Sequence, residues 1–116
     1  MTFNEIRAFA VLAGFTGAAA DIAAAIALAE SGGDSFAQGD PHGSSAATPN
    51  GTSTSFGLWQ VHTPVHQQYK PSRLLQEPLY SAQAAYAISN GGVNFNPWTT
   101  FRDGTYKRFL PTGGAA

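Results

Sequence analysis

The sequence predicts one mainly helical α+β domain with a small β-hairpin, and three observations support this prediction. The chain has 116 residues, which suits a single hydrophobic core. Apolar residues recur at helical spacing twice before residue 31 and again after Pro78. Between these segments, Asn50-Gly51 is a strong hairpin-turn signal. We expect residues 1–110 to form the domain and residues 111–116 to be a flexible tail or linker.

Composition excludes several classes of function. Charged residues make up only 11% of the chain, against roughly 25% in typical soluble proteins. The net charge is -1 and no run of Lys or Arg occurs, so we expect no nucleic-acid partner. Without cysteine there is neither a disulfide nor a thiolate metal site. No apolar stretch reaches the length of about 18 residues that a membrane helix needs. We therefore expect no membrane partner and no cofactor.

The N-terminal segment is expected to be a helix rather than an export signal. Apolar side chains recur at steps of three and four, which predicts a short helix over residues 4–14 that ends at Gly14. The apolar stretch Ala8 to Phe15 resembles the core of a signal peptide, but it is short and Glu5 precedes it. We find no convincing signal peptide.

The second helix carries the main candidate residue. Thr16 offers a side-chain oxygen as N-cap, and the helix runs through Ala29 or Glu30 before glycines stop it. Ile22, Ile26 and Glu30 follow one another at i+4 steps, so they share one face. This spacing places Glu30 on the core side of the helix.

The middle of the chain is predicted to hold a functional loop with a hairpin. Residues 31–55 are rich in Gly, Ser, Asn, Asp and Pro, and long loops in small domains are usually functional. We expect strands over residues 46–48 and 52–55 on either side of Asn50-Gly51. A short helix over residues 64–69 follows.

The last third of the chain is predicted to contain one good helix. Pro78 opens it, and it runs to Asn90, where Gly91-Gly92 stops it. From Asn96 we expect a coil-like segment that reaches Tyr106 and Phe109.

Glu30 has the surroundings that a general acid for glycosidic bond cleavage needs. An ordinary Glu, with a pKa of about 4.3, is only about 0.2% protonated at pH 7. Apolar neighbours disfavour the anion, and the exposed carbonyls of a helix C-terminus repel negative charge. Both effects predict a raised pKa for Glu30. The alternative is that Glu30 is a solvated residue at a helix end.

Three segments give the chain its family resemblance: AESGGD, SFGLWQVH and AAYAISNGGVNFNPWTTF. Over residues 18–106 their order and spacing resemble the lysozyme superfamily. The segments are most similar to soluble lytic transglycosylase and goose-type lysozyme domains, especially those of phages that infect actinobacteria. The resemblance implies a lysozyme-like fold, in which a small β-hairpin lobe faces the helices across a substrate cleft.

The resemblance also implies the site residues. Glu30 opens the E-S-G motif and matches the catalytic acid. The remaining matches are substrate-binding residues. Gly57, Leu58 and Gln60 match residues on the cleft floor. Tyr86 matches a tyrosine that hydrogen-bonds near the acid, and Asn94 and Trp98 match residues at sugar subsites.

Ser55 marks a departure that bears on mechanism. In animal c-type lysozymes this position carries the second carboxylate, and retaining hydrolysis needs two carboxylates about 5 Å apart. Asp34 or Asp40 could activate water instead, but nothing in the sequence fixes their direction. A single-acid lytic transglycosylase fits better, in which Glu30 protonates the leaving oxygen and then deprotonates the 6-hydroxyl of muramic acid. Hydrolysis by a muramidase and a glycan-binding or structural virion module are the alternatives.

Other candidate side chains have two interpretations each. His62 and His66 lie four apart and could bind zinc, but Pro64 separates them, which favours cleft-edge or surface residues. Ser55 and its hairpin neighbours either contact sugar hydroxyls or satisfy their own backbone. The aromatic side chains either stack on sugars or fill the core, and Trp98 is the best candidate for an exposed subsite lining.

The biological context follows from the resemblance alone. It implies peptidoglycan glycan strands as the partner and action at the bacterial cell wall. It also implies a place in a larger phage tail protein or in a released phage lysin.

Overall fold

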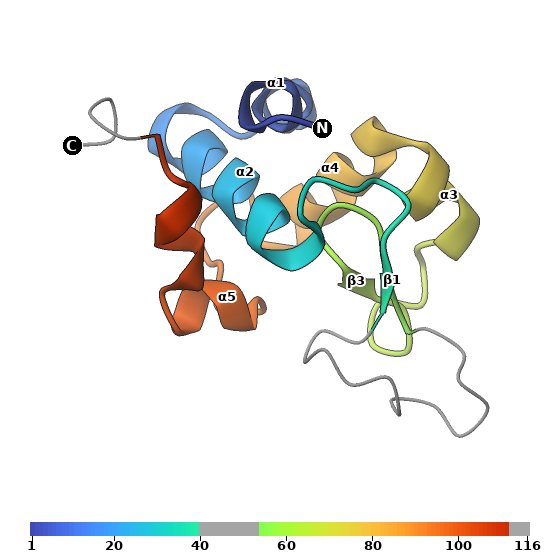
Figure 1. Cartoon of the computed structure of the whole chain (residues 1–116). Helices are drawn as coiled ribbons and strands as arrows, with labels where there is room; N and C mark the ends of the chain where they lie inside the picture. Colours follow the sequence, from blue (N-terminus) through green and yellow to red (C-terminus); the bar gives the residue numbers. More distant parts are fainter. Residues whose placement is uncertain (40–53, 112–116) are drawn as a thin grey trace.

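The computed structural model describes residues 1–39 and 54–111, and this part of the chain is mainly helical (Figure 1). Helix α1 (Phe3–Ala13) begins at a capping box, in which Thr2 Oγ1 accepts the Glu5 N–H and the Glu5 carboxylate accepts the Thr2 N–H. The first predicted helix is thereby confirmed.

Helix α2 (Gly17–Ser31) lies at the centre of the molecule, and α1, α5 and η1 pack around it. Its alanines let neighbouring elements come close, because they carry no long side chains. Thr16 is the N-cap in backbone conformation, but its side chain makes no capping hydrogen bond, so that part of the prediction was wrong. Gly32, in the left-handed conformation, ends the helix as expected. The buried residues of α2 are Ala20, Ala23, Ala24, Ala25, Ile26 and Ala27.

The sheet has three very short antiparallel strands in the order β1-β2-β3. They are β1 (Gln38–Gly39), β2 (Ser55–Phe56) and β3 (Val61–His62). Ser55 pairs with His62 in the register between β2 and β3. This sheet stands beside the C-terminal end of α2 (Figure 1).

The hairpin seen in the structure turns at Gly57–Gln60, between β2 and β3. Gly57 has φ 84 and Gln60 has φ 48, so both ends of this turn adopt the left-handed region. The predicted turn at Asn50-Gly51 and the predicted strand over 46–48 lie outside the described residues. Of the predicted strand over 52–55, only its end falls within the description, where Ser55 belongs to β2.

Two helices follow the sheet. Residues 64–69 form turns rather than the predicted helix, and α3 (Pro71–Gln76) begins later. Pro71 explains the later start, because proline fits the first turn of a helix and restricts the residue before it. Helix α4 (Pro78–Ile88) opens at Pro78, as predicted, and packs against α1.

The segment after Asn96 is helical rather than coil-like, which corrects the sequence prediction. It contains α5 (Thr99–Arg102) and a 3-10 helix, η1 (Thr105–Phe109). Both pack against α2. No helix in the described part of the chain has the length and apolar character that crossing a membrane requires.

Candidate active site

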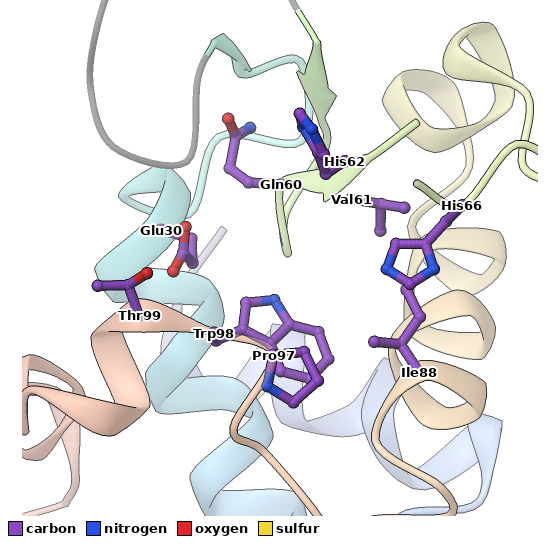
Figure 2. Close-up of a pocket in the computed structure, with 9 residues that line it drawn as sticks. All are labelled: Glu30, Gln60, Val61, His62, His66, Ile88, Pro97, Trp98 and Thr99. Atoms are coloured by element: carbon purple, nitrogen blue, oxygen red, sulfur yellow. The ribbon is translucent and has the colours of Figure 1, made fainter. Parts of the chain in front are cut away.

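A small pocket opens where α2 ends, and we call it the Glu30 pocket. Figure 2 shows Glu30 and Thr99 on one side, His66 on the other and the Trp98 ring between them. Its volume of about 50 Å³ is far below the roughly 300–1,000 Å³ of drug-sized ligand sites, so the pocket holds only a small chemical group. The lining residues are Glu30, Gln60, Val61, His62, His66, Ile88, Pro97, Trp98 and Thr99.

Glu30 lies in the last turn of α2 and is partly buried. Ile26, one turn earlier, is fully buried, so the predicted face is the one that meets the core. Thr100 Oγ1 donates a 2.8 Å hydrogen bond to Glu30 Oε2. The carboxyl group is therefore held at the pocket wall by a residue far away in the sequence.

Two tryptophans connect the walls of the pocket, and we call their hydrogen bonds the tryptophan link. Trp59 Nε1 donates to the carbonyl oxygen of Ala23 in α2 at 2.9 Å. Trp98 Nε1 donates to the carbonyl oxygen of Trp59, also at 2.9 Å. Both side chains are buried, so each bond satisfies polar atoms that water cannot reach. The link fixes the segment before α5 against the hairpin turn and α2.

Gln60 has the buried amide that the sequence suggested would need partners. Its Nε2 donates to the carbonyl oxygens of Ala37 at 3.0 Å and Gly57 at 2.9 Å. The side chain is 8% exposed, and the residue lines the Glu30 pocket. Gln60 thus closes the hairpin turn and ties it to the segment before β1.

Ser55, Gly57 and Leu58 do not line the Glu30 pocket. All three are buried. Ser55 Oγ lies 3.3 Å from Nδ1 of His62, its partner across the strands. A direct contact of these three residues with sugar stays a prediction, and their burial favours a supporting role.

His62 and His66 face the Glu30 pocket from β3 and from the turn that follows it, not from a helix. Burial lowers the pKa of His66 below its ordinary value, and the charge of His62 adds a smaller effect in the same direction. Within residues 1–39 and 54–111, no group of three or more His, Cys, Asp or Glu could hold a metal ion.

The residues of the third motif are placed differently from one another. Trp98 lines the pocket, but it is 6% exposed rather than exposed as we expected. Tyr86 packs edge-on against Phe15, with ring centres 5.1 Å apart, and is not a lining residue. Asn94 is exposed outside the lining, and its Oδ1 accepts the backbone N–H of Asn96.

The two candidate water-activating carboxylates do not line the pocket in the described part of the chain. Asp34 is exposed after α2, and its Oδ1 accepts the backbone N–H of Phe36 at 2.9 Å. Asp40 lies outside the described residues. Among the described residues that line the pocket, Glu30 supplies the only carboxylate.

Thr99 and Thr100 are site residues that the sequence analysis did not single out. Thr99 lines the pocket, and its Oγ1 accepts a 2.8 Å hydrogen bond from Arg102. The signal for them was weak: two threonines directly after Trp98, inside a motif that already carried the resemblance.

A comparison with models of protein families identifies the family of this domain. The model of the lysozyme-like domain matches residues 7–100, which include Glu30, the hairpin turn and Trp98. The chain belongs to the lysozyme-like domain family. A search of curated proteins and a search of solved structures each found no match.

Membership in the lysozyme-like family confirms the predicted fold class, with mainly helical structure and a small antiparallel sheet. It also gives the coarse activity, because lysozyme-like domains act on the glycan strands of peptidoglycan in the cell wall as glycosidases or lytic transglycosylases.

Proposed function

We propose that this lysozyme-like domain is a lytic transglycosylase that cuts the β-1,4 bond between N-acetylmuramic acid and N-acetylglucosamine. The observation that carries the proposal is the position of Glu30. It is a partly buried carboxyl group on the wall of a pocket whose other described lining residues include no carboxylate. One acid group in such surroundings suits a mechanism that needs one acid.

Glu30 serves first as acid and then as base. Its carboxyl proton moves to the glycosidic oxygen as the bond from that oxygen to C1 of the muramic acid breaks. The 6-hydroxyl of the same muramic acid then gives its proton to the Glu30 carboxylate, and its oxygen bonds to C1. Glu30 recovers its proton, and the product is a 1,6-anhydro end. No water and no second carboxylate enter the balance.

Hydrolysis by a muramidase is the alternative within the same family. Retaining hydrolysis uses a second carboxylate about 5 Å from the acid, and inverting hydrolysis uses one about 6.5–9.5 Å away. By the sequence resemblance, Ser55 stands where animal c-type lysozymes carry the second carboxylate, and Asp34 Oδ1 accepts the backbone N–H of Phe36 in its own turn. These placements favour transglycosylation over hydrolysis.

The substrate-binding roles divide between the wall and its support. We infer that Gln60 and Trp98 contact the glycan, since both line the Glu30 pocket. Ser55, Gly57 and Leu58 support that wall, while Tyr86 and Asn94 act outside the enclosed pocket. In this proposal, Gln60 and Trp98 hold a sugar of the glycan strand at the mouth of the Glu30 pocket, and the other residues act from outside the pocket or support its wall.

The setting of the reaction is part of this proposal. We infer that the domain acts at the bacterial cell wall within a phage tail protein or as a released phage lysin. The similarity of its motifs to phage domains supports this setting.

Digestion of purified peptidoglycan with wild type and Glu30→Gln tests the proposal. We expect Glu30→Gln to lose about 10²–10⁴-fold in the rate of fragment release, the usual contribution of a general acid. Glu5→Gln is the matched control, because glutamine also completes a capping box at this position. Thermal unfolding should be close to wild type for both variants.

Three results have different meanings. Loss of turnover in Glu30→Gln alone supports Glu30 as the acid, and 1,6-anhydro ends on the wild-type fragments support transglycosylation over hydrolysis. Turnover by Glu30→Gln at the wild-type rate contradicts it. Binding of glycan strands by wild type without any shortening would instead favour a non-catalytic glycan-binding or structural module.

A further inference from the structure

Thr100 contacts the candidate acid, Glu30, although the two residues lie far apart in the sequence. Its Oγ1 lies 2.8 Å from Glu30 Oε2, and the two residues are 70 positions apart. An ionised carboxylate only accepts hydrogen bonds, so the threonine hydroxyl is the donor whenever Glu30 is charged. Both residues are partly buried, so water competes less for this bond than at the surface.

The position of Thr100 is fixed by several neighbours of its short helix. Helix α5 has only four residues and cannot hold its place alone. The tryptophan link anchors Trp98, which precedes it, to the carbonyl oxygen of Trp59. Phe101, which follows Thr100, packs against the rings of Phe95 and Tyr106 with centres 5.6 and 5.0 Å away. Thr100 therefore meets Glu30 as part of a packed element.

We propose that Thr100 is a positioning residue for Glu30, which orients its carboxyl group and stabilises the carboxylate formed after proton transfer. This inference rests on the proposed function and deepens it. The hydroxyl would restrict rotation of the carboxyl plane, which is otherwise a soft torsion. It would also donate to the negative charge that appears when Glu30 gives up its proton.

Two kinetic consequences distinguish this role from a purely structural one. A hydrogen bond that strengthens as charge develops acts on the chemical step, so its loss lowers kcat and leaves KM nearly unchanged. Loss of a donor to the carboxylate also favours the protonated form of Glu30. The alkaline limb of the pH–rate profile should then move to higher pH.

The test compares Thr100→Val with Thr100→Ser on purified peptidoglycan. Valine keeps the shape and removes the hydroxyl, while serine keeps the hydroxyl and removes a methyl group. We expect Thr100→Val to lower kcat about 10-fold to 100-fold, the range for a hydrogen bond to a charged group. KM should change less than about twofold, and the alkaline limb should move to higher pH. Thr100→Ser should recover most of the rate.

The outcomes separate this inference from the proposed function. If Thr100→Val keeps the wild-type kcat and pH profile while Glu30→Gln is inactive, the positioning role is wrong and the proposed function stands. If Glu30→Gln itself is active, the proposed function fails. Equal losses in Thr100→Val and Thr100→Ser would overturn the hydroxyl's role. Should the valine variant not fold, Thr100→Ala removes the same hydroxyl and is judged by the same criteria.

Discussion

Trp98 donates its indole N–H to the carbonyl oxygen of Trp59 at 2.9 Å, and this bond joins the segment before α5 to the hairpin turn. Trp59 in turn donates to Ala23 in α2, the helix that carries Glu30. Thr100 follows Trp98 by two residues and bonds to Glu30. The two tryptophans thus help to set the distance between the acid and the hydroxyl that contacts it.

Trp98→Phe tests this connection. Phenylalanine keeps an aromatic ring but leaves the buried Trp59 carbonyl without its indole donor, which costs about 1–3 kcal/mol in the free energy of unfolding. Urea unfolding would measure this loss. We also expect a lower kcat, and a smaller effect of Trp98→Phe when Thr100 is already valine, because both changes act through α5. Fully additive effects on kcat would contradict the connection.

Gly57→Ala should destabilise the hairpin turn more than backbone strain alone explains. A Cβ at Gly57 would lie 2.5 Å from the Leu74 carbonyl oxygen and 2.7 Å from Ser81 Oγ. Gly104 is the matched control, because its φ of 82 is close to the 84 of Gly57 while a Cβ there meets nothing within 4 Å. Each substitution costs about 1–3 kcal/mol in strain, and the collision adds to this only at Gly57. Equal losses in urea unfolding would show that the turn accommodates a side chain.

Acidification should weaken the fold through His66. Its pKa is held below its ordinary value of 6.5, first by burial and then by the charge of His62. The unfolded chain therefore binds this proton more readily, so the free energy of unfolding falls as the pH drops below about 6.5. The carboxyl groups with lowered pKa values have ordinary values of 4.5 or below, so they act only in more acidic solution: Glu5, Glu77 and Asp103.

Urea unfolding at about pH 7.5 and 5.5 checks this effect. We expect His66→Gln to show a smaller loss between the two pH values than wild type does. His66 contributes nothing to the pH dependence if the two proteins lose the same free energy.

Chelation should leave activity unchanged. The described residues hold no group of three or more potential metal ligands, although His62 and His66 share the Glu30 pocket. Two imidazoles alone do not complete the three or four protein ligands of a zinc site. Peptidoglycan digestion before and after treatment with EDTA measures this directly. A loss that zinc restores would revive the metal interpretation.

Local patterns predicted the parts of the fold that depend on neighbouring residues. The helix containing Glu30 was identified from the i+4 spacing that ends in Ile26 and Glu30, and Gly32 stops it. Pro78 likewise marked the start of α4. The same patterns did not reveal α5, because a helix of four residues owes its position to packing against α2 rather than to periodicity.

Long-range contacts account for what the sequence did not reveal in the site. The Thr100 hydroxyl reaches Glu30 across 70 residues, and no local pattern encodes that contact. Trp98 was expected to be exposed because proline precedes it, but its indole N–H finds the Trp59 carbonyl and draws the ring inward. The roles of Tyr86 and Asn94 toward substrate stay predictions.

Mass spectrometry of peptidoglycan fragments released by wild type and by Glu30→Gln tests the central claim most directly. We predict 1,6-anhydro ends from wild type, lighter by one water than reducing ends, and almost no fragments from Glu30→Gln. Reducing ends from wild type would contradict the single-acid mechanism and require a water-activating base. Fragments from both proteins at equal rates would remove Glu30 from the chemistry.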